Sequence, residues 1–345
     1  MQPPKTILLG NQSGPINILI RKKTLKWCFV LLFASLLVAI FSISSGQLST
    51  SFDEVISAFT NTGHSLTQTV VIEWRLPRLA SSLLFGAALG VSGALFQSLI
   101  RNPLGSPDII GFNTGSYTGA LAVIILFSGS YIQIAFGAII GGALSALIVY
   151  IIAYKGGIQG FRLIIIGIGI SAMLSAFNMW MMVSANLDVA MKAAMWGAGS
   201  LNGMTWTKVT PSYLFIVSGL IIAGVIAKQM QMLEMGDDSA KMLGINTEKL
   251  RVIAMVVGVV LTAAVTAACG PISFISLVAP QLAQKLVKAN SITIATSALM
   301  GAMLLTASDY LAVNLFAPNQ LPVGIVTVSL GGIYLVYLLI QHSGR

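Results

Sequence analysis

Long runs of residues without a charged side chain, separated by short segments that carry Lys and Arg, dominate the pattern along this chain. A helix needs about 20 consecutive apolar residues to cross the hydrocarbon core of a bilayer. A transmembrane β-strand is about half that length and alternates apolar with polar positions, which these runs do not do. The pattern therefore predicts an all-α polytopic membrane protein. The uncharged runs cover residues 27–52, 79–100, 109–154, 163–187, 209–227, 252–284, 289–308 and 310–344.

Two of these runs are too long for a single helix, and each contains a turn signal. The run 109–154 is divided at Gly129-Ser130, and the run 252–284 at Gly270-Pro271. These divisions bring the prediction to about ten transmembrane helices. The first run follows a basic cluster and resembles a signal peptide. We interpret it as an uncleaved anchor, because it is long for a signal-peptide core and nine further spans follow.

The composition supports lipid as the solvent, since 56% of the residues are hydrophobic and only 8% are charged. Soluble domains carry about 25% charged residues. Most of the 19 Lys and Arg residues fall in alternate segments between the runs. The positive-inside rule then places both termini in the cytoplasm. This predicts a cytoplasmic tail, residues 1–24, followed by a ten-helix membrane domain, residues 25–345, whose longest cytoplasmic connection is 228–251.

Motifs for catalysis and for nucleotide binding are absent from the sequence. A phosphate-binding loop needs Lys and Ser or Thr after its second glycine, but Val-Ile-Ala follow Gly224. His64 and His342 are far apart and are predicted on opposite sides of the membrane, and both cysteines lie in apolar runs. We therefore expect no catalytic residue, no metal site and no cofactor bound by this chain.

Acidic residues near the apolar runs are scarce. Asp108 is expected to cap the start of a helix, where the helix dipole favours a carboxylate. Asp309 is expected to cap a helix or to reach water at the outer end of its span. Proton-coupled carriers use ionisable residues near the middle of the membrane, so this scarcity counts against an ion-coupled secondary transporter. That class remains the alternative function, and a structural membrane scaffold is a third.

Several segments together resemble the permease subunits of the iron–siderophore and vitamin B12 class of ABC importers, the FecCD type of type II importer. They occur in the order and at the spacing of that family. The segments are 73–78 (EWRLPR), 86–97 (GAALGVSGALFQ), 101–108 (RNPLGSPD), 270–280 (GPISFISLVAP) and 321–327 (LPVGIVT). The stretches 161–169 and 199–203 are most similar to the members that carry ferric enterobactin. Gln281 and Gln284 stand where the family commonly has His and Arg.

The resemblance implies a permease subunit in the bacterial inner membrane that imports a ferric siderophore, of the enterobactin-like catecholate type, from the periplasm. Its partners would be a second permease subunit, two ATPase subunits that bind ATP and Mg²⁺, and a periplasmic siderophore-binding protein. The chain itself would not be an enzyme. The second permease subunit would be either a sister chain or a second copy of this chain.

Basic residues on the outer side and a charged segment on the inner side are the candidate contact sites. Arg75 and Arg78 precede a span on the outer side, where they either reach lipid headgroups or dock the binding protein. The resemblance favours docking. On the inner side, the segment 235–244 is expected to form a short helix that contacts the ATPase, unless it is a solvated loop. Its candidate residues are Met235, Gly236, Asp237, Asp238, Met242, Leu243 and Gly244.

Polar residues mixed with methionine in the run 163–187 suggest part of a partly hydrated translocation path. Methionine adapts to irregular surfaces, although helix packing explains much of it equally well. The candidate path residues are Asn178, Met181, Met182, Ser184 and Asn186.

Overall fold

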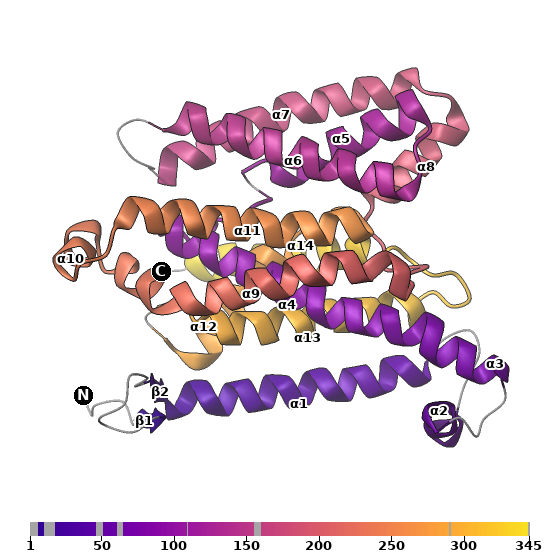
Figure 1. Ribbon diagram of the computed structural model, residues 1–345, viewed down its shortest axis with the longest axis horizontal. Helices are drawn as coiled ribbons and strands as arrows, with labels where there is room; N and C mark the ends of the chain where they lie inside the picture. The colour runs from indigo at the N-terminus through magenta and orange to yellow at the C-terminus, as the bar shows by residue number, and fades with distance from the viewer. Residues whose placement is uncertain are drawn as a thin grey trace.

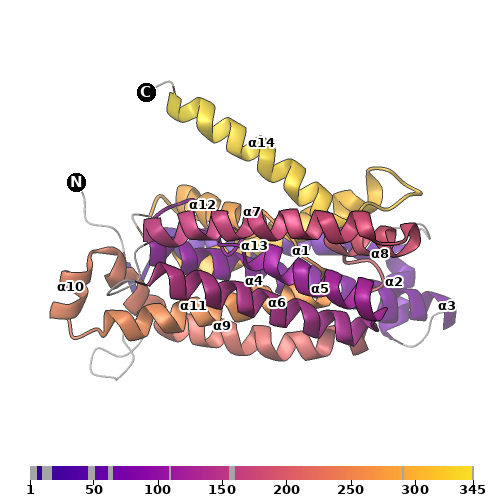
Figure 2. The same cartoon turned by 90° about the horizontal axis from the view of Figure 1, so that it is seen from above.

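The computed structural model describes residues 6–9, 18–45, 51–60, 65–108, 110–154, 160–289 and 291–343, and almost all of this part of the chain is helical (Figures 1 and 2). The elements are β1 (Thr6–Leu9), β2 (Ile18–Arg21), α1 (Lys22–Ser44), α2 (Phe52–Phe59), α3 (Ser65–Gln68), the π-helix η1 (Thr69–Arg75), α4 (Leu76–Ile100), α5 (Phe112–Phe127), α6 (Tyr131–Ala153), α7 (Gly160–Ser184), α8 (Leu187–Gly197), α9 (Trp206–Glu234), α10 (Asp237–Met242), α11 (Thr247–Cys269), α12 (Ile275–Val287), α13 (Ile294–Asn314) and α14 (Val323–Ser343).

Each of the ten predicted spans contains a helix, so the all-α prediction is confirmed. Seven described helices are long and apolar enough to cross a membrane, and α5 and α14 contain shorter apolar helices. Both predicted breaks are present, one between α5 and α6 and the other between α11 and α12. Since α12 has 13 residues, it spans only about 20 Å at 1.5 Å per residue. The count of ten crossings and the cytoplasmic position of the termini stay predictions.

The helix ends differ from the predicted ones because charged residues were used to delimit the runs. Helix α9 continues past Lys228 to Glu234, and α13 continues through Asp309 to Asn314. A charged side chain does not end a helix where the helix leaves the hydrocarbon or where the charge finds a partner. The short helices α2, α3 and α8 were not predicted, since they fall below the length of a span. The antiparallel pair β1–β2 in the tail was not predicted either.

Helix α4 lies in the middle of the bundle (Figure 1). It packs against α13, α11, α9 and α12, while α5, α6 and α7 form a group beside α11, and α1 packs on the far side of α13. Helix α14 contacts α13 and α12 and then projects away from the other helices (Figure 2). The end of α14 and the start of α1 lie on the same side of the molecule as α10 (Figures 1 and 2).

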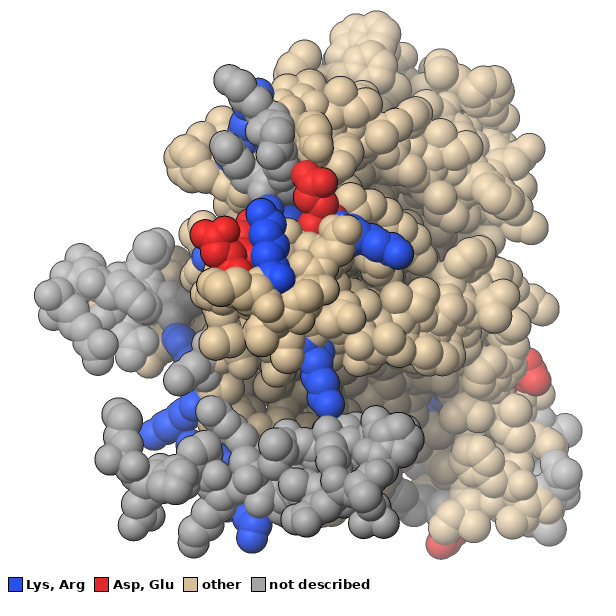
Figure 3. All heavy atoms as spheres, turned by 60° about the vertical axis from the view of Figure 1, so that its left-hand side comes forward, with Lys and Arg blue, Asp and Glu red and all other residues tan. Residues whose placement is uncertain are grey.

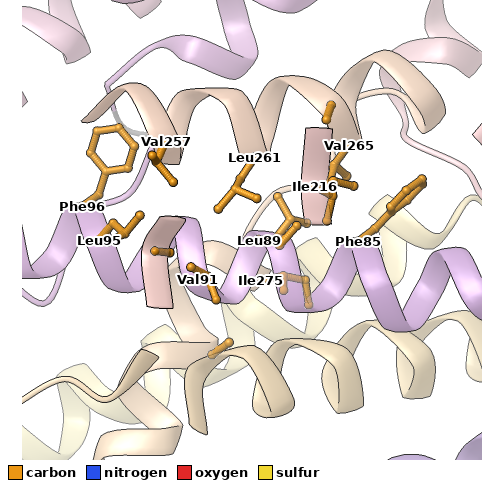
Figure 4. Packing of buried hydrophobic residues seen from close by; sticks show 14 of the residues in the cluster. Phe85, Leu89, Val91, Leu95, Phe96, Ile216, Val257, Leu261, Val265 and Ile275 are labelled. Carbon is orange, nitrogen blue, oxygen red and sulfur yellow. The ribbon is translucent and has the colours of Figure 1, made fainter. Parts of the chain in front are cut away.

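The buried core is built around α4, where every residue from Ala88 to Ile100 is buried. Apolar side chains of α4 meet side chains of α9, α11 and α12 at close range (Figure 4). The labelled residues of this cluster are Phe85, Leu89, Val91, Leu95, Phe96, Ile216, Val257, Leu261, Val265 and Ile275.

Glycines allow α4 to approach its neighbours at backbone distance. A Cβ at Gly90 would collide with the carbonyl oxygen of Ser297, and a Cβ at Gly86 with that of Gly301. Small residues permit such contacts between membrane helices, which lack a hydrophobic driving force against one another. The α4–α13 contact therefore depends on the absence of side chains at these positions.

We predict that Gly90→Ala destabilises the protein by roughly 1–3 kcal/mol, because the added methyl group forces α4 and α13 apart. Thermal unfolding of the purified protein in detergent measures this change. Gly224→Ala is the matched control, since no atom lies within 4 Å of a Cβ at Gly224 and alanine favours the helix over glycine. Equal unfolding temperatures for the two variants would contradict the packing explanation.

Candidate functional site

The short helix α10 is held at one end of the bundle between two glycines with positive φ. Gly236 has φ +125° and Gly244 has φ +81°, values that favour glycine over residues with a Cβ. The carboxylate of Asp237 accepts two hydrogen bonds from the Arg251 guanidinium, at 2.8 and 2.9 Å, and also pairs with Arg101. The predicted helix in this segment is therefore present, and its first residue is tied to α11 and to the end of α4.

The apolar side chains of the α10 segment face outward. Met235 is 74% exposed, Met242 83% and Leu243 61%, and Asp238 beside them is exposed as well. Lys, Arg, Asp and Glu side chains gather at this end of the molecule, whereas the adjoining flank carries very few of them (Figure 3). An apolar surface with charged surroundings suits protein contact. We call Met235, Met242 and Leu243 the α10 surface.

At the opposite end, Arg78 is engaged within the chain. Its guanidinium donates to both carboxylate oxygens of Asp309, at 2.8 and 2.9 Å, and to Gln320 Oε1 at 3.1 Å. The Asp309 side chain is 2% exposed and that of Arg78 is 16% exposed. Asp309 therefore does not cap a helix or reach water, as the sequence suggested, but forms a buried bidentate ion pair.

Arg75 lies near Arg78 on a cavity of about 390 Å³ at this end of the bundle. Its Nη1 donates to the Ile43 carbonyl oxygen of α1 at 2.8 Å, and its side chain is half-buried. Trp74, next to it, is 58% exposed. The structure thus brings the two predicted arginines to one face, and it gives both of them contacts within the chain. Their docking role stays a prediction.

A cavity of about 460 Å³, lined by polar and apolar side chains, lies between α5, α7 and the segment that links α11 to α12. Of the predicted path residues, Asn178 and Met182 line it. Asn178 is 5% exposed, and its Oδ1 has no hydrogen-bond partner. The residues that complete the lining were not predicted: Asn113, Thr114, Tyr117, Ser175, Met179, Pro271 and Ser273. The polar spacing of residues 113, 114 and 117 and the 270–280 motif are the sequence signals that could have found them.

The other predicted path residues lie elsewhere. Met181 is buried in a separate cluster with Leu121, Ile124 and Ala193. Ser184 is exposed at the end of α7, and Asn186 is exposed at the N-cap position of α8. The run 163–187 therefore contributes to the cavity through one face of α7, because residues 175, 178, 179 and 182 share that face at helical spacing.

Asp108 holds the start of α12, not the start of its own following helix. Its Oδ2 accepts from the Ser276 hydroxyl at 2.8 Å and from the Phe274 N–H at 3.3 Å, and its Oδ1 accepts from Asn113. The expected cap on the helix that follows Asp108 is therefore absent, and the carboxylate bonds to two residues at the start of α12. The short helix α12 starts inside the bundle, next to this carboxylate.

Gln281 joins the same region from further along α12. Its Nε2 donates to the Pro103 carbonyl oxygen at 2.7 Å, and the residue is 7% exposed. The glutamine therefore links α12 to the 102–105 segment after α4. Gln284 is half-buried one turn further on.

The comparisons with known proteins agree with this architecture. A model of the FecCD transport family matches residues 32–341. The chain is 49% identical over 328 residues to the ferric enterobactin transport system permease protein FepG of Escherichia coli (strain K12). This match covers 95% of this chain and 99% of that protein. It is 33% identical to the iron(3+)-hydroxamate import system permease protein FhuG of Bacillus subtilis (strain 168), across 94% of this chain and 100% of that protein.

A solved structure is similar along nearly the whole length. It is described as an inward-facing conformation of a metal-chelate type ABC transporter, with a TM-score of 0.80 and 25% identity, and the match covers 92% of this chain and 99% of that one. The expected family resemblance is therefore confirmed in sequence and in fold. The chain belongs to the FecCD transport family.

Proposed function

We propose that this chain is the membrane-spanning permease subunit of an ABC importer that carries a ferric siderophore of the enterobactin-like catecholate type into the cytoplasm. The 49% identity to FepG over 95% of this chain carries this proposal. The chain acts as a transport path and not as an enzyme. ATP and Mg²⁺ bind to a separate ATPase, of which two copies dock on the α10 side, and a periplasmic binding protein delivers the siderophore to the inner membrane.

The cavity beside α7 supports a path at the edge of this subunit. Its lining offers amide and hydroxyl groups and thioethers, and none of its lining residues is charged. Such groups can hydrogen-bond to the oxygen atoms of a large chelate without holding it tightly. Since α14 projects away from the bundle, we place a second permease subunit against this side, so that the path lies between the two subunits.

The contacts of the acidic residues argue against the ion-coupled alternative. Among the residues that the structure describes, Asp108 and Asp309 are the acids that lie deep in the helical bundle, and both are held by several donors within the chain. A proton relay needs an acid that can exchange its proton with water along a path. Neither carboxylate lines the α7 cavity.

The first prediction tests the transport function itself. Proteoliposomes that contain this chain, the second permease and the ATPase should take up radiolabelled ferric enterobactin when ATP is inside and the loaded binding protein is outside. Asn178→Leu should reduce the uptake rate by about tenfold or more, because it removes a polar group from the proposed path. Thermal stability should stay unchanged or rise, because the variant removes an unsatisfied buried polar atom. Uptake that proceeds equally well without the ATPase would contradict the proposal.

The second prediction concerns the ATPase contact through the α10 segment, Met235 to Gly244. The double variant Met242→Lys and Leu243→Lys should lower co-purification of the ATPase, because two exposed apolar anchors are replaced by charges that oppose burial. Leu66→Lys is the control, since Leu66 is 66% exposed at the other end of the molecule. If both variants retain the ATPase equally, the α10 surface is not the contact.

The third prediction concerns docking of the binding protein at the outer face. Arg75→Glu should weaken binding at low salt more than Arg75→Gln does, because charge reversal adds repulsion whereas neutralisation only removes an attraction. Arg78 is left intact so that its pair with Asp309 survives. Binding to the complex in nanodiscs is measured at low salt and at 1 M salt, where the Debye length falls to about 3 Å. A defect that is independent of salt would indicate a lost internal contact with Ile43 in place of docking.

A further inference from the structure

The central helix α4 carries an ion pair at each of its two ends. Arg78, in its first turn, pairs with Asp309 of α13. Arg101, which follows its last residue, pairs with Asp237 of α10 and donates to the Leu233 carbonyl oxygen of α9 at 2.8 Å. Helix α4 therefore connects the α10 side of the molecule to the face that holds Arg75 and Arg78.

The distance between these pairs is close to the full depth of the membrane. The 25 residues of α4 span about 38 Å at 1.5 Å per residue, compared with a hydrocarbon core of about 30 Å. A helix of this length transmits a displacement only if its neighbours keep it from bending and move with it.

The contacts along α4 meet this condition. Its glycines abut the backbone of α13, and a Cβ at Gly93 would collide with the carbonyl oxygen of Ser276 in α12. The Ser92 hydroxyl donates to the Gly258 carbonyl oxygen of α11 at 2.8 Å, and Gln97 Nε2 donates to that of Leu277 at 2.9 Å. Helix α4 is thus fixed to three neighbours along the half nearest to α10.

The ion pairs at the α10 end add a second connection. Asp237 is bound at once by Arg101 from α4 and by Arg251 from the first turns of α11. A displacement of Asp237 therefore acts on both arginines. The α10 surface is apolar and exposed. The residues that face outward are therefore distinct from Asp237, which anchors the helix.

Since these features join both faces of the molecule, we propose that α4 transmits the state of the ATPase-facing helix α10 to the outer face, with Asp237 and Asp309 as the positioning residues at its two ends. This inference rests on the proposed importer function. In it, Asp237 acts through Arg101 and Arg251, and Asp309 acts through Arg78. Because coupling between two sites is reciprocal, arrival of the loaded binding protein at the outer face should alter ATP hydrolysis through the same helix.

The test uses the assembled complex in nanodiscs and measures the stimulation factor, the ratio of ATP hydrolysis with the loaded binding protein to hydrolysis without it. This ratio does not depend on how much complex a variant assembles. Asp237→Asn and Asp309→Asn should each lower the stimulation factor about threefold or more. The double variant should fall no further than the more affected single variant, because a transmission element that is broken once cannot be broken again.

Matched carboxylate-to-amide controls come from both faces. Glu248→Gln, exposed near α10, and Asp188→Asn, exposed on α8, should leave the stimulation factor unchanged. If Asp237→Asn or Asp309→Asn prevents assembly, the same comparison of single and double variants is made with Arg101→Lys and Arg78→Lys. These variants retain the charge and alter the geometry of the pairs.

Independent effects, in which the losses of the two single variants multiply in the double variant, would overturn the proposal. A wild-type stimulation factor in either single variant would also overturn it. These results leave uptake by the wild-type complex in place, so failure of the coupling helix is distinguishable from failure of the importer function. The latter would show as no ATP-dependent uptake by the wild-type complex.

Discussion

Lipid offers no hydrogen-bond partner, so a polar group inside this bundle is costly unless the protein supplies one. This constraint explains the two carboxylates that lie deep within it. Asp309 is satisfied by the guanidinium of Arg78, and Asp108 is satisfied by the donors at the start of α12. Both solutions join segments that are far apart in the sequence. Deep polar residues therefore act here as links between helices, and they hold the short helix α12 inside the bundle.

The same constraint gives α4 its central place. Its glycines and small polar residues bring α11, α12 and α13 to its backbone, and its two ends carry the arginines that pair with Asp309 and Asp237. Helices α1 and α14 lie at the edges of the bundle. The arrangement combines a closely packed centre with a cavity at the edge beside α7.

The hydrophobic runs were sufficient to predict the helices of the ten expected spans, because a span must be long and uncharged. They could not predict where α9 and α13 end, since Lys228 and Asp309 lie within helices. The α10 helix and the glycines that bound it were predicted from local signals. The partners of Asp237, Arg78 and Asp108 were not, because these contacts join residues distant in the chain. The α7 cavity was only partly predicted, because Asn113 and Ser273 reach it through tertiary packing.

The central claim is that the siderophore crosses along the α7 side of this chain, against a second permease subunit. A cryo-electron microscopy structure of the assembled complex, trapped with ferric siderophore during transport, tests this most directly. The account predicts density for the chelate between the two permease subunits, within contact distance of Asn113, Asn178 or Ser273. Density enclosed within this chain alone, or lying on the far side beside α1, would contradict it.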